Sequence, residues 1–297
     1  MRVRTLAVGL LVGGLALSAC GKEGSPSTSG GPSTTAAVET NVDVAGSPTF
    51  TKMKSRGSVI VGAKEDQPGL GNKDATTGKY SGFDIEIAKL IAAKLGFTED
   101  KITFKTIPSA GREQALINGD VDYYVGTYTI NDKRKTQVSF AGPYFQAGQD
   151  LLVRKDESAI TGKDTLKGKK VCSVTGSTPI QRVRDQNLTE AANIVEFQNY
   201  SQCVSKLLSK DGVDAVTTDD AILKGYAAQD PDKLKVIGQT FSKEPYGIGL
   251  AKDDKALRDK VNDILAKAEG DGTWKSLYDA TLGKSGSKAD PPAIERY

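Results

Sequence analysis

Histidine is absent from this 297-residue chain. Without imidazole, a protein lacks the commonest general base and the commonest transition-metal ligand. The sequence therefore excludes a histidine-dependent hydrolase and a zinc enzyme, and no catalytic residue, metal or cofactor is expected. An excess of one charge is also lacking, because 40 Lys and Arg face 37 Asp and Glu, for a net charge of +3 at pH 7. With no Lys/Arg block either, a nucleic-acid partner is not expected.

Long apolar runs are rare as well. The run at residues 6–17 follows Arg2 and Arg4, and its roughly 12 residues are too few for a membrane span, which takes about 20. It ends in Leu-Ser-Ala before Cys20, which resembles a bacterial lipobox. We therefore predict a signal peptide at residues 1–19 and a diacylated Cys20, with palmitate expected, on the extracytoplasmic face of the cell membrane. The alternative is an ordinary secretory signal with an incidental cysteine.

Only three cysteines are present. With Cys20 assigned to lipid, Cys172 and Cys203 remain, and an even pair in an oxidising compartment predicts a disulfide. The alternative is two buried free thiols. Residues 20–48 are dominated by Gly, Ser, Thr and Pro, so they cannot bury enough apolar surface to offset their ordering entropy. They are predicted to form a flexible tether.

The remaining residues, about 235 in number, alternate between strand and helix patterns. Strands are predicted at residues 58–63, 101–107, 121–126, 170–174, 193–197, 213–217, 234–238 and 246–251, and helices at 83–95, 112–118, 203–210, 220–228, 256–268, 274–278 and from 178 onward. This order predicts an α/β fold with parallel sheets. Ligands of such sheets bind at the carboxyl ends of strands, which directs attention to Lys64 and to residues 127–129, 175–178 and 218–220.

The side chains near these strand ends share a chemical theme. Lys64, Arg112 and Arg134 are cations, and Ser177 and Thr178 open a helix whose N-terminal amides favour anions. Asp219 is the acid expected to point inward. Such a set suits a ligand with two carboxylates and one ammonium. Each charge taken alone is more often a solvated surface group, and spacing does not decide between the two interpretations.

Five short motifs in one order carry a family resemblance. They are GFDI at residues 82–85, LINGDVD at 116–122, GTYTI at 126–130, FAGPY at 140–144 and DAVTTDD at 214–220. Together, behind a lipobox, they resemble the polar amino-acid family of extracytoplasmic solute-binding proteins (family 3). Residues 64–71 are similar to those of glutamate-binding lipoproteins.

The resemblance implies a two-lobed periplasmic-binding-protein type II fold, in which two α/β lobes close about a hinge. The implied division places the first part of lobe 1 at 49–152, lobe 2 at 153–243, a return segment completing lobe 1 at 244–284, and a flexible tail at 285–297. Partners implied by the family are an ABC permease and its cytoplasmic ATPase.

The resemblance also assigns the grip on the α-carboxylate. Arg134 matches the arginine that holds this group, since a guanidinium can make two parallel charge-assisted bonds. Thr129 matches a hydroxyl donor to the same carboxylate, and Thr178 would complete the cradle from the other lobe.

The ammonium of the ligand has its own matches. Thr127 matches a residue whose backbone carbonyl commonly meets the ammonium. Asp219 matches the acid that pairs with it, and Asp220 is the neighbouring alternative.

The distal carboxylate is expected to face Lys64 and Arg112, with a hydroxyl from Ser109. A second pair of cations favours an acidic ligand, because an unpaired buried cation beside an amide would weaken binding. The sequence thus predicts a binding protein for glutamate, with aspartate or glutamine as alternatives. A dehydratase-like enzyme or a ligand-sensing lobe on the same scaffold is the rival interpretation, and fold alone does not exclude either.

Overall fold

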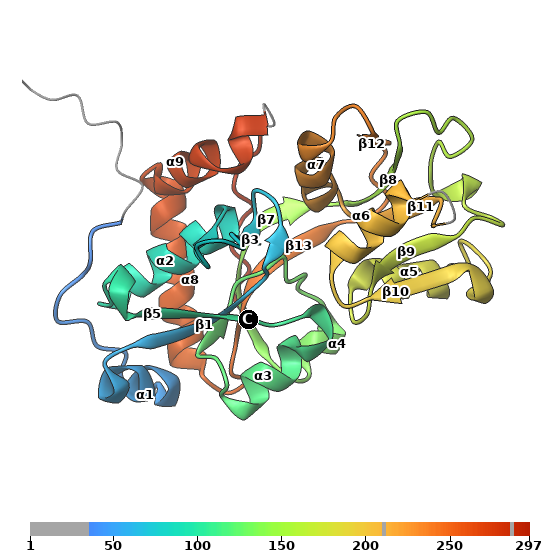
Figure 1. Cartoon of the computed structure of the whole chain (residues 1–297). Helices are drawn as coiled ribbons and strands as arrows, with labels where there is room; N and C mark the ends of the chain where they lie inside the picture. The colour runs from blue at the N-terminus through green and yellow to red at the C-terminus, as the bar shows by residue number, and fades with distance from the viewer. Residues whose placement is uncertain (1–35, 210–211, 286–287) are drawn as a thin grey trace, which may run out of the picture. The chain divides into compact units, whose positions relative to one another are not determined.

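The computed structural model describes residues 36–209, 212–285 and 288–297. The predicted signal peptide, Cys20 and the first part of the predicted tether lie outside the described residues. Within them, two five-stranded sheets and one small three-stranded sheet form the framework (Figure 1).

The first sheet has the strand order β5-β1-β6-β13-β7. Its strands are β1 (Val59–Ala63), β5 (Ile102–Thr106), β6 (Tyr123–Tyr124), β7 (Ser139–Ala147) and β13 (Glu244–Leu250). β1 runs parallel to β5 and β6, whereas β13 is antiparallel to β6 and β7. The helices of this half are α1 (Pro48–Arg56), α2 (Phe83–Lys94), α3 (Arg112–Asn118), α4 (Asp132–Lys135), α8 (Lys255–Gly270) and α9 (Thr273–Ala280).

The second sheet has the order β10-β9-β11-β8-β12. Its strands are β8 (Gln149–Arg154), β9 (Val171–Val174), β10 (Ile194–Phe197), β11 (Ala215–Asp219) and β12 (Leu234–Val236), and its helices are α5 (Thr178–Asp185), α6 (Tyr200–Leu208) and α7 (Asp220–Gln229). The predicted disulfide is present: Cys172 on β9 is bonded to Cys203 on α6, with the two Cα atoms 5.6 Å apart. The bond ties the helix to the sheet it covers.

These two sheets form two lobes, as predicted. The chain passes from the first sheet to the second between β7 and β8, at Gly148, and returns between β12 and β13. A Cβ at Gly148 would lie 2.8 Å from the Ser242 carbonyl oxygen, so glycine lets the two crossing strands approach closely. The predicted boundary after residue 152 falls inside β8 and differs from this crossing by a few residues.

The sequence predicted parallel sheets, whereas both large sheets are mixed. Each large sheet contains one reversed strand, because β8 and β13 enter by the connections between lobes and not through helical crossovers. A smaller antiparallel sheet is formed by β2 (Asp66–Gln67), β3 (Gly71–Lys73) and β4 (Tyr80–Ser81). We call the segment between β1 and α2 that contains this small sheet the flap.

The end of the predicted tether makes contacts that the sequence did not predict. Ser47 caps α1 by accepting a hydrogen bond from the Phe50 amide, and its hydroxyl donates to Asp254 Oδ2 at 2.7 Å. Val44 is buried. The structure therefore packs the last residues before position 48 against the first lobe.

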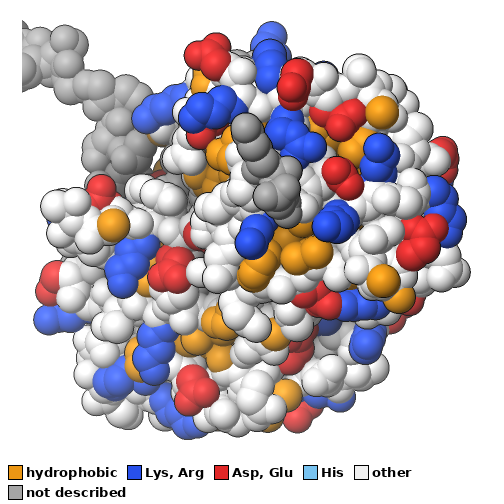
Figure 2. All heavy atoms as spheres, turned by 45° about the vertical axis from the view of Figure 1, so that its right-hand side comes forward, with side chains coloured by type: hydrophobic (Ala, Val, Ile, Leu, Met, Phe, Trp, Pro, Cys, Tyr) orange, Lys and Arg blue, Asp and Glu red, His pale blue; other side chains and the backbone are white. Residues whose placement is uncertain are grey.

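The predicted flexible tail also makes specific contacts where the structure describes it. The Phe140 amide donates to the Tyr297 hydroxyl at 2.8 Å, and the Glu295 amide donates to the Gly142 carbonyl at 2.9 Å. On the face shown in Figure 2, Lys/Arg and Asp/Glu side chains are interspersed, in line with the near-neutral composition.

Candidate ligand-binding site

Two arginine side chains of the first lobe lie on one aromatic ring. The Arg112 and Arg134 guanidinium carbons are 4.4 Å and 4.9 Å from the centroid of the Tyr128 ring. Both guanidinium groups also donate to the carbonyl oxygen of Gly176 in the second lobe, at 3.4 Å and 3.1 Å. The two predicted arginines therefore meet in one crevice between the lobes, where cation–π contact with Tyr128 helps to hold them.

Backbone carbonyls fix the orientation of each guanidinium group. Arg112 opens α3 and donates to the carbonyl oxygens of Ser109 at 3.1 Å and Thr127 at 3.3 Å. Arg134 sits in α4, whose N-cap is Asn131, and donates to the Thr129 carbonyl oxygen at 2.7 Å. The loop 127–129 thus orients the two arginines through its backbone carbonyl groups.

The three predicted cations differ in whether an acidic side chain pairs with them. Arg134 forms an ion pair with Glu113, with 3.1 Å between Nε and Oε1. Burial and the nearby Arg112 lower the pKa of Arg134 to about 10. In the part of the chain that the structure describes, neither Lys64 nor Arg112 forms an ion pair with an Asp or Glu side chain.

Lys64 is the most perturbed of these cations. Lys64 directly follows β1 and is only 4% exposed. Its Nζ donates to the Ser109 hydroxyl at 2.7 Å. Burial first, and repulsion by Arg112 second, lower the pKa of Lys64 to about 7. Two of the predicted site residues, Lys64 and Ser109, are therefore in direct contact.

Thr178 comes from the second lobe. It is the first residue of α5, and Ser177 caps this helix by accepting from the Ile180 amide at 3.2 Å. The Thr178 hydroxyl donates to Glu244 Oε2 at 2.8 Å and lies 3.5 Å from the Thr129 hydroxyl of the first lobe. The predicted helix start is confirmed, and Thr178 faces the other lobe.

Asp219 ends β11 with its carboxylate inside the crevice. Tyr246 donates to its Oδ2 at 2.6 Å, whereas Oδ1 is buried with no hydrogen-bond partner among the described residues. Burial, and then the nearby Glu244, raise the pKa of Asp219 to about 7. Asp220 turns elsewhere, accepting from the Gly148 amide and pairing with Lys224. Of the two candidates, Asp219 is the one that faces the other predicted residues.

A cavity of about 10 Å³ lies where these groups converge. It is lined by Ser109, Arg112, Thr127, Thr129, Arg134, Ser177, Thr178, Pro179, Tyr200 and Asp219. Every predicted ligand-binding residue except Lys64 lines it, and Lys64 reaches it through Ser109. Its volume is about that of one water molecule, so the lobes are closed upon each other.

Sequence reasoning missed several neighbours of this cavity. Tyr200 follows β10, so the strand-end rule that selected the other residues would have found it too. Tyr128 is fully buried, yet its ring face carries both guanidinium groups. The Thr127 side chain exchanges hydrogen bonds with Gln67, a residue that no sequence signal singled out.

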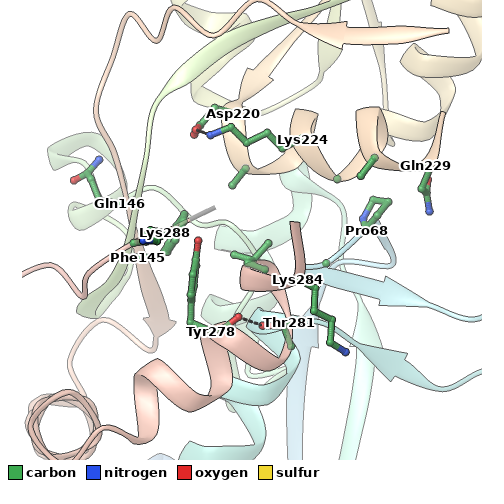
Figure 3. A pocket seen from close by; sticks show the side chains of 16 residues that line it. Pro68, Phe145, Gln146, Asp220, Lys224, Gln229, Tyr278, Thr281, Lys284 and Lys288 are labelled. Carbon is green, nitrogen blue, oxygen red and sulfur yellow. Dashed lines mark hydrogen bonds and ion pairs between the residues drawn. The ribbon is translucent and has the colours of Figure 1, made fainter. Parts of the chain in front are cut away.

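A larger cavity of about 400 Å³ lies beside α7, between Pro68 of the flap and Tyr278 of α9 (Figure 3). Asp220 and Lys224 at its edge pair with each other. Because the buried, incompletely paired charges converge in the small cavity and not here, the small cavity is the stronger candidate for ligand binding.

Comparison with known proteins identifies the family. Residues 59–284 match the model of bacterial extracellular solute-binding proteins, family 3. The chain belongs to this family. A glutamine-binding protein of Geobacillus stearothermophilus is 43% identical, covering 84% of this chain and 92% of the relative. A glutamate-binding protein of Corynebacterium glutamicum is 38% identical, covering 91% and 87%.

A solved structure supports the fold. An ancestral arginine-binding protein bound to glutamine superimposes with a TM-score of 0.71 at 40% identity, covering 77% of this chain and 99% of that protein. The chain is thus an amino-acid-binding protein of an extracytoplasmic family that works with ABC transporters. Among the described residues no helix is long and apolar enough to span a membrane.

Proposed function

We propose that this protein binds glutamate between its lobes and delivers it to an ABC permease. One observation carries the proposal: Lys64 and Arg112 are buried cations, and neither has an acidic partner among the described side chains. A buried unpaired cation is costly. A second carboxylate on the ligand would supply the missing charge.

The common part of an amino acid fits the remaining groups. Its α-carboxylate would take the Arg134 guanidinium and the hydroxyls of Thr129 and Thr178, and the helix start at α5 favours the same charge. Its ammonium would meet the free Oδ1 of Asp219. The carbonyl of Thr127, which Arg112 now contacts, is the expected second acceptor for the ammonium.

The distal carboxylate would then face Arg112 and the Lys64–Ser109 pair. These three side chains lie at one end of the crevice, joined by the Lys64–Ser109 and Arg112–Ser109 hydrogen bonds. Glutamate places its two carboxylates at opposite ends of one extended molecule. Aspartate is shorter by one methylene and would reach one of the two ends poorly.

Closure follows from the division of the site between lobes. Lys64, Arg112 and Arg134 belong to the first lobe, and Thr178 and Asp219 to the second. A cavity of about 10 Å³ cannot admit an amino acid, so the lobes must part for entry and close again around the ligand. The ligand would shift the population toward the closed form by contacts that exist only there.

Membrane attachment and partners complete the proposal. Cys20 would carry lipid, the residues after it would act as a tether on the extracytoplasmic face, and a permease with a cytoplasmic ATPase would receive the ligand. We keep the predicted division into lobe 1, lobe 2 and a return segment, but we place the boundary between lobe 1 and lobe 2 at Gly148.

Glutamine is the second candidate, favoured by the relatives that are named for it. Calorimetry with glutamate, glutamine and aspartate separates the two. We expect glutamate to bind most tightly, and Lys64→Gln to weaken glutamate by about 10- to 100-fold while changing glutamine little. Lys79→Gln, at an exposed lysine of the same lobe, is the matched control. Equal affinity for glutamine and glutamate in the unaltered protein would show that the distal assignment is wrong.

A further inference from the structure

A second contact between the lobes lies away from the ligand cavity. Asp66, in strand β2 of the flap, accepts a hydrogen bond from the Ser201 amide at the start of α6, with 3.0 Å to Oδ2. The Tyr226 hydroxyl of α7 donates to the Asp66 backbone carbonyl and lies 3.2 Å from Asp66 Oδ2. We call this contact between residues 66–70 and the helices α6 and α7 the flap interface.

The flap interface includes one close approach of backbones. Gly225 lies in the middle of α7, and a Cβ added there would be 2.3 Å from the Pro68 carbonyl oxygen of the first lobe. No real Cβ tolerates that distance to a backbone atom. Glycine is unfavourable inside a helix, so nothing in α7 by itself explains it. Closure of the lobes does explain it. Figure 3 shows Pro68 beside α7, the helix that carries Lys224 and Gln229.

None of these flap residues lines the small cavity. They therefore make their contacts with the opposite lobe whichever amino acid is bound, and they lose them when the lobes part. A contact of this kind favours the closed form without distinguishing between ligands. The apparent affinity of every ligand scales with the population of the competent closed form.

We propose that the flap interface sets the closed-state population and so scales the affinity for all ligands equally, with Tyr226 and Gly225 as positioning residues. Specificity is left to Lys64, Ser109 and Arg112. The inference rests on the proposed function in one respect, namely that the ligand binds between the lobes.

The first test is Tyr226→Phe, which removes one hydroxyl from the flap interface and keeps the ring. We expect the Kd values for glutamate and glutamine to rise by the same factor, about 2- to 10-fold for one hydrogen bond, with faster ligand release. Tyr80→Phe is the matched control, because the Tyr80 hydroxyl bonds Thr106 within the first lobe at 2.7 Å. Asp66 is left intact since its charge also raises the pKa of Lys64.

The second test is Gly225→Ala. In the open protein alanine suits the helix, so the melting temperature of the ligand-free protein is expected to stay unchanged or to rise. Closure would bring the new methyl against the Pro68 carbonyl, so both affinities are expected to fall about tenfold or more. Small-angle scattering with saturating glutamate should then show a larger radius of gyration than for the unaltered protein.

The outcomes separate the two proposals. If the unaltered protein binds neither glutamate nor glutamine, the proposed function fails. If it binds them and both variants keep the original affinities, the proposed function stands and the flap interface has no such role. A change in the glutamate-to-glutamine ratio in Tyr226→Phe would likewise overturn the inference, because it would make the flap interface part of the specificity site.

Discussion

In the proposed site, Lys64 would make the choice between glutamate and glutamine depend on pH. With the lobes closed and no ligand between them, the pKa of Lys64 is lowered to about 7, chiefly by burial, so the side chain loses its charge as the pH rises through 7. Glutamate needs the charged form, whereas the amide of glutamine does not. In the proposed site Asp219 would pair with the ammonium of both ligands, so its titration should cancel in a comparison between them.

We therefore expect the preference for glutamate over glutamine to fall about tenfold between pH 6 and pH 8. The measurement is calorimetry of both ligands at pH 6, 7 and 8. Lys64→Arg is the control, because a guanidinium stays charged throughout and should flatten the profile. A preference that is constant with pH in the unaltered protein contradicts the role of Lys64.

Asp219 illustrates a conflict between binding and stability. The pKa of Asp219 in the folded protein is about 7, above the ordinary value of 3.8. Between about pH 4 and pH 7 the carboxyl group is therefore protonated in the native state but ionised in the unfolded state. The free energy of unfolding therefore falls as the pH rises from about 4 to 7 on account of this group. Well above pH 7 the buried carboxylate is fully charged, and the loss of stability caused by its burial reaches its full value.

Asp219→Asn is accordingly expected to raise the melting temperature of the ligand-free protein at pH 8, and to change it little at pH 4. The same variant should lose about 100-fold or more in glutamate affinity, since the ammonium loses its charged partner. Thermal melts at both pH values and calorimetry at pH 8 test this. Asp220→Asn should keep the affinity; a loss there equal to that in Asp219→Asn would reverse the assignment.

At the scale of elements, the predicted helices and strands depended on local signals. The helix at 112–118 was bounded by Gly119, which adopts a left-handed conformation at its C-cap, and α5 begins at the predicted Ser-Thr-Pro signal. β7 was missed because Gly142 and Pro143 interrupt a buried run that would otherwise be recognised as a strand. The helix α1 carries its own Ser47-Pro48 start signal, but the surrounding composition favoured a tether.

The candidate site was predictable only as a set of residues. The strand-end rule and the resemblance selected side chains that the structure brings to one crevice. The sequence could not reveal that Tyr128 supports both arginines. Nor could it reveal that Glu113 pairs with Arg134, whereas Arg112 has no acidic partner among the described side chains. Such pairings depend on side-chain directions across elements that are distant in the chain, and no local pattern encodes them.

The Cys172–Cys203 disulfide is the covalent link between two elements of the second lobe. It closes a loop with a sequence separation of 31 residues. Loop-closure entropy predicts that replacing both cysteines by serine lowers the free energy of unfolding by about 3–4 kcal/mol. Urea unfolding of the double variant measures this loss, and the unaltered protein treated with dithiothreitol should unfold at the same urea concentration. An unchanged midpoint would show that the disulfide does not stabilise the fold.

For the whole molecule, the two-lobed architecture was the most predictable feature. The prediction of two lobes depends on the order of strands and helices over residues 59–284, so it holds even when single elements are predicted wrongly. The ends were less predictable. The average composition of residues 20–48 predicted a tether up to residue 48, although the structure buries Val44 and uses the Ser47 hydroxyl to link α1 with Asp254.

This packing predicts where the binding unit begins. A chain that starts at residue 36 should melt and bind glutamate like one that keeps the whole tether, since all site residues and their contacts are retained. A chain that starts at residue 49 lacks the α1 cap, the Ser47–Asp254 bond and the buried Val44 side chain. Its free energy of unfolding should be lower by about 2–3 kcal/mol, from about 1 for the cap and 1.5 or more for the valine. Thermal and urea unfolding of the two chains test this, and Ser47→Ala in the longer chain isolates the hydroxyl. Because none of these groups lines the ligand cavity, the shorter chain should still bind glutamate below its melting temperature, and equal stability of the two chains would show that the segment before α1 is a tether throughout.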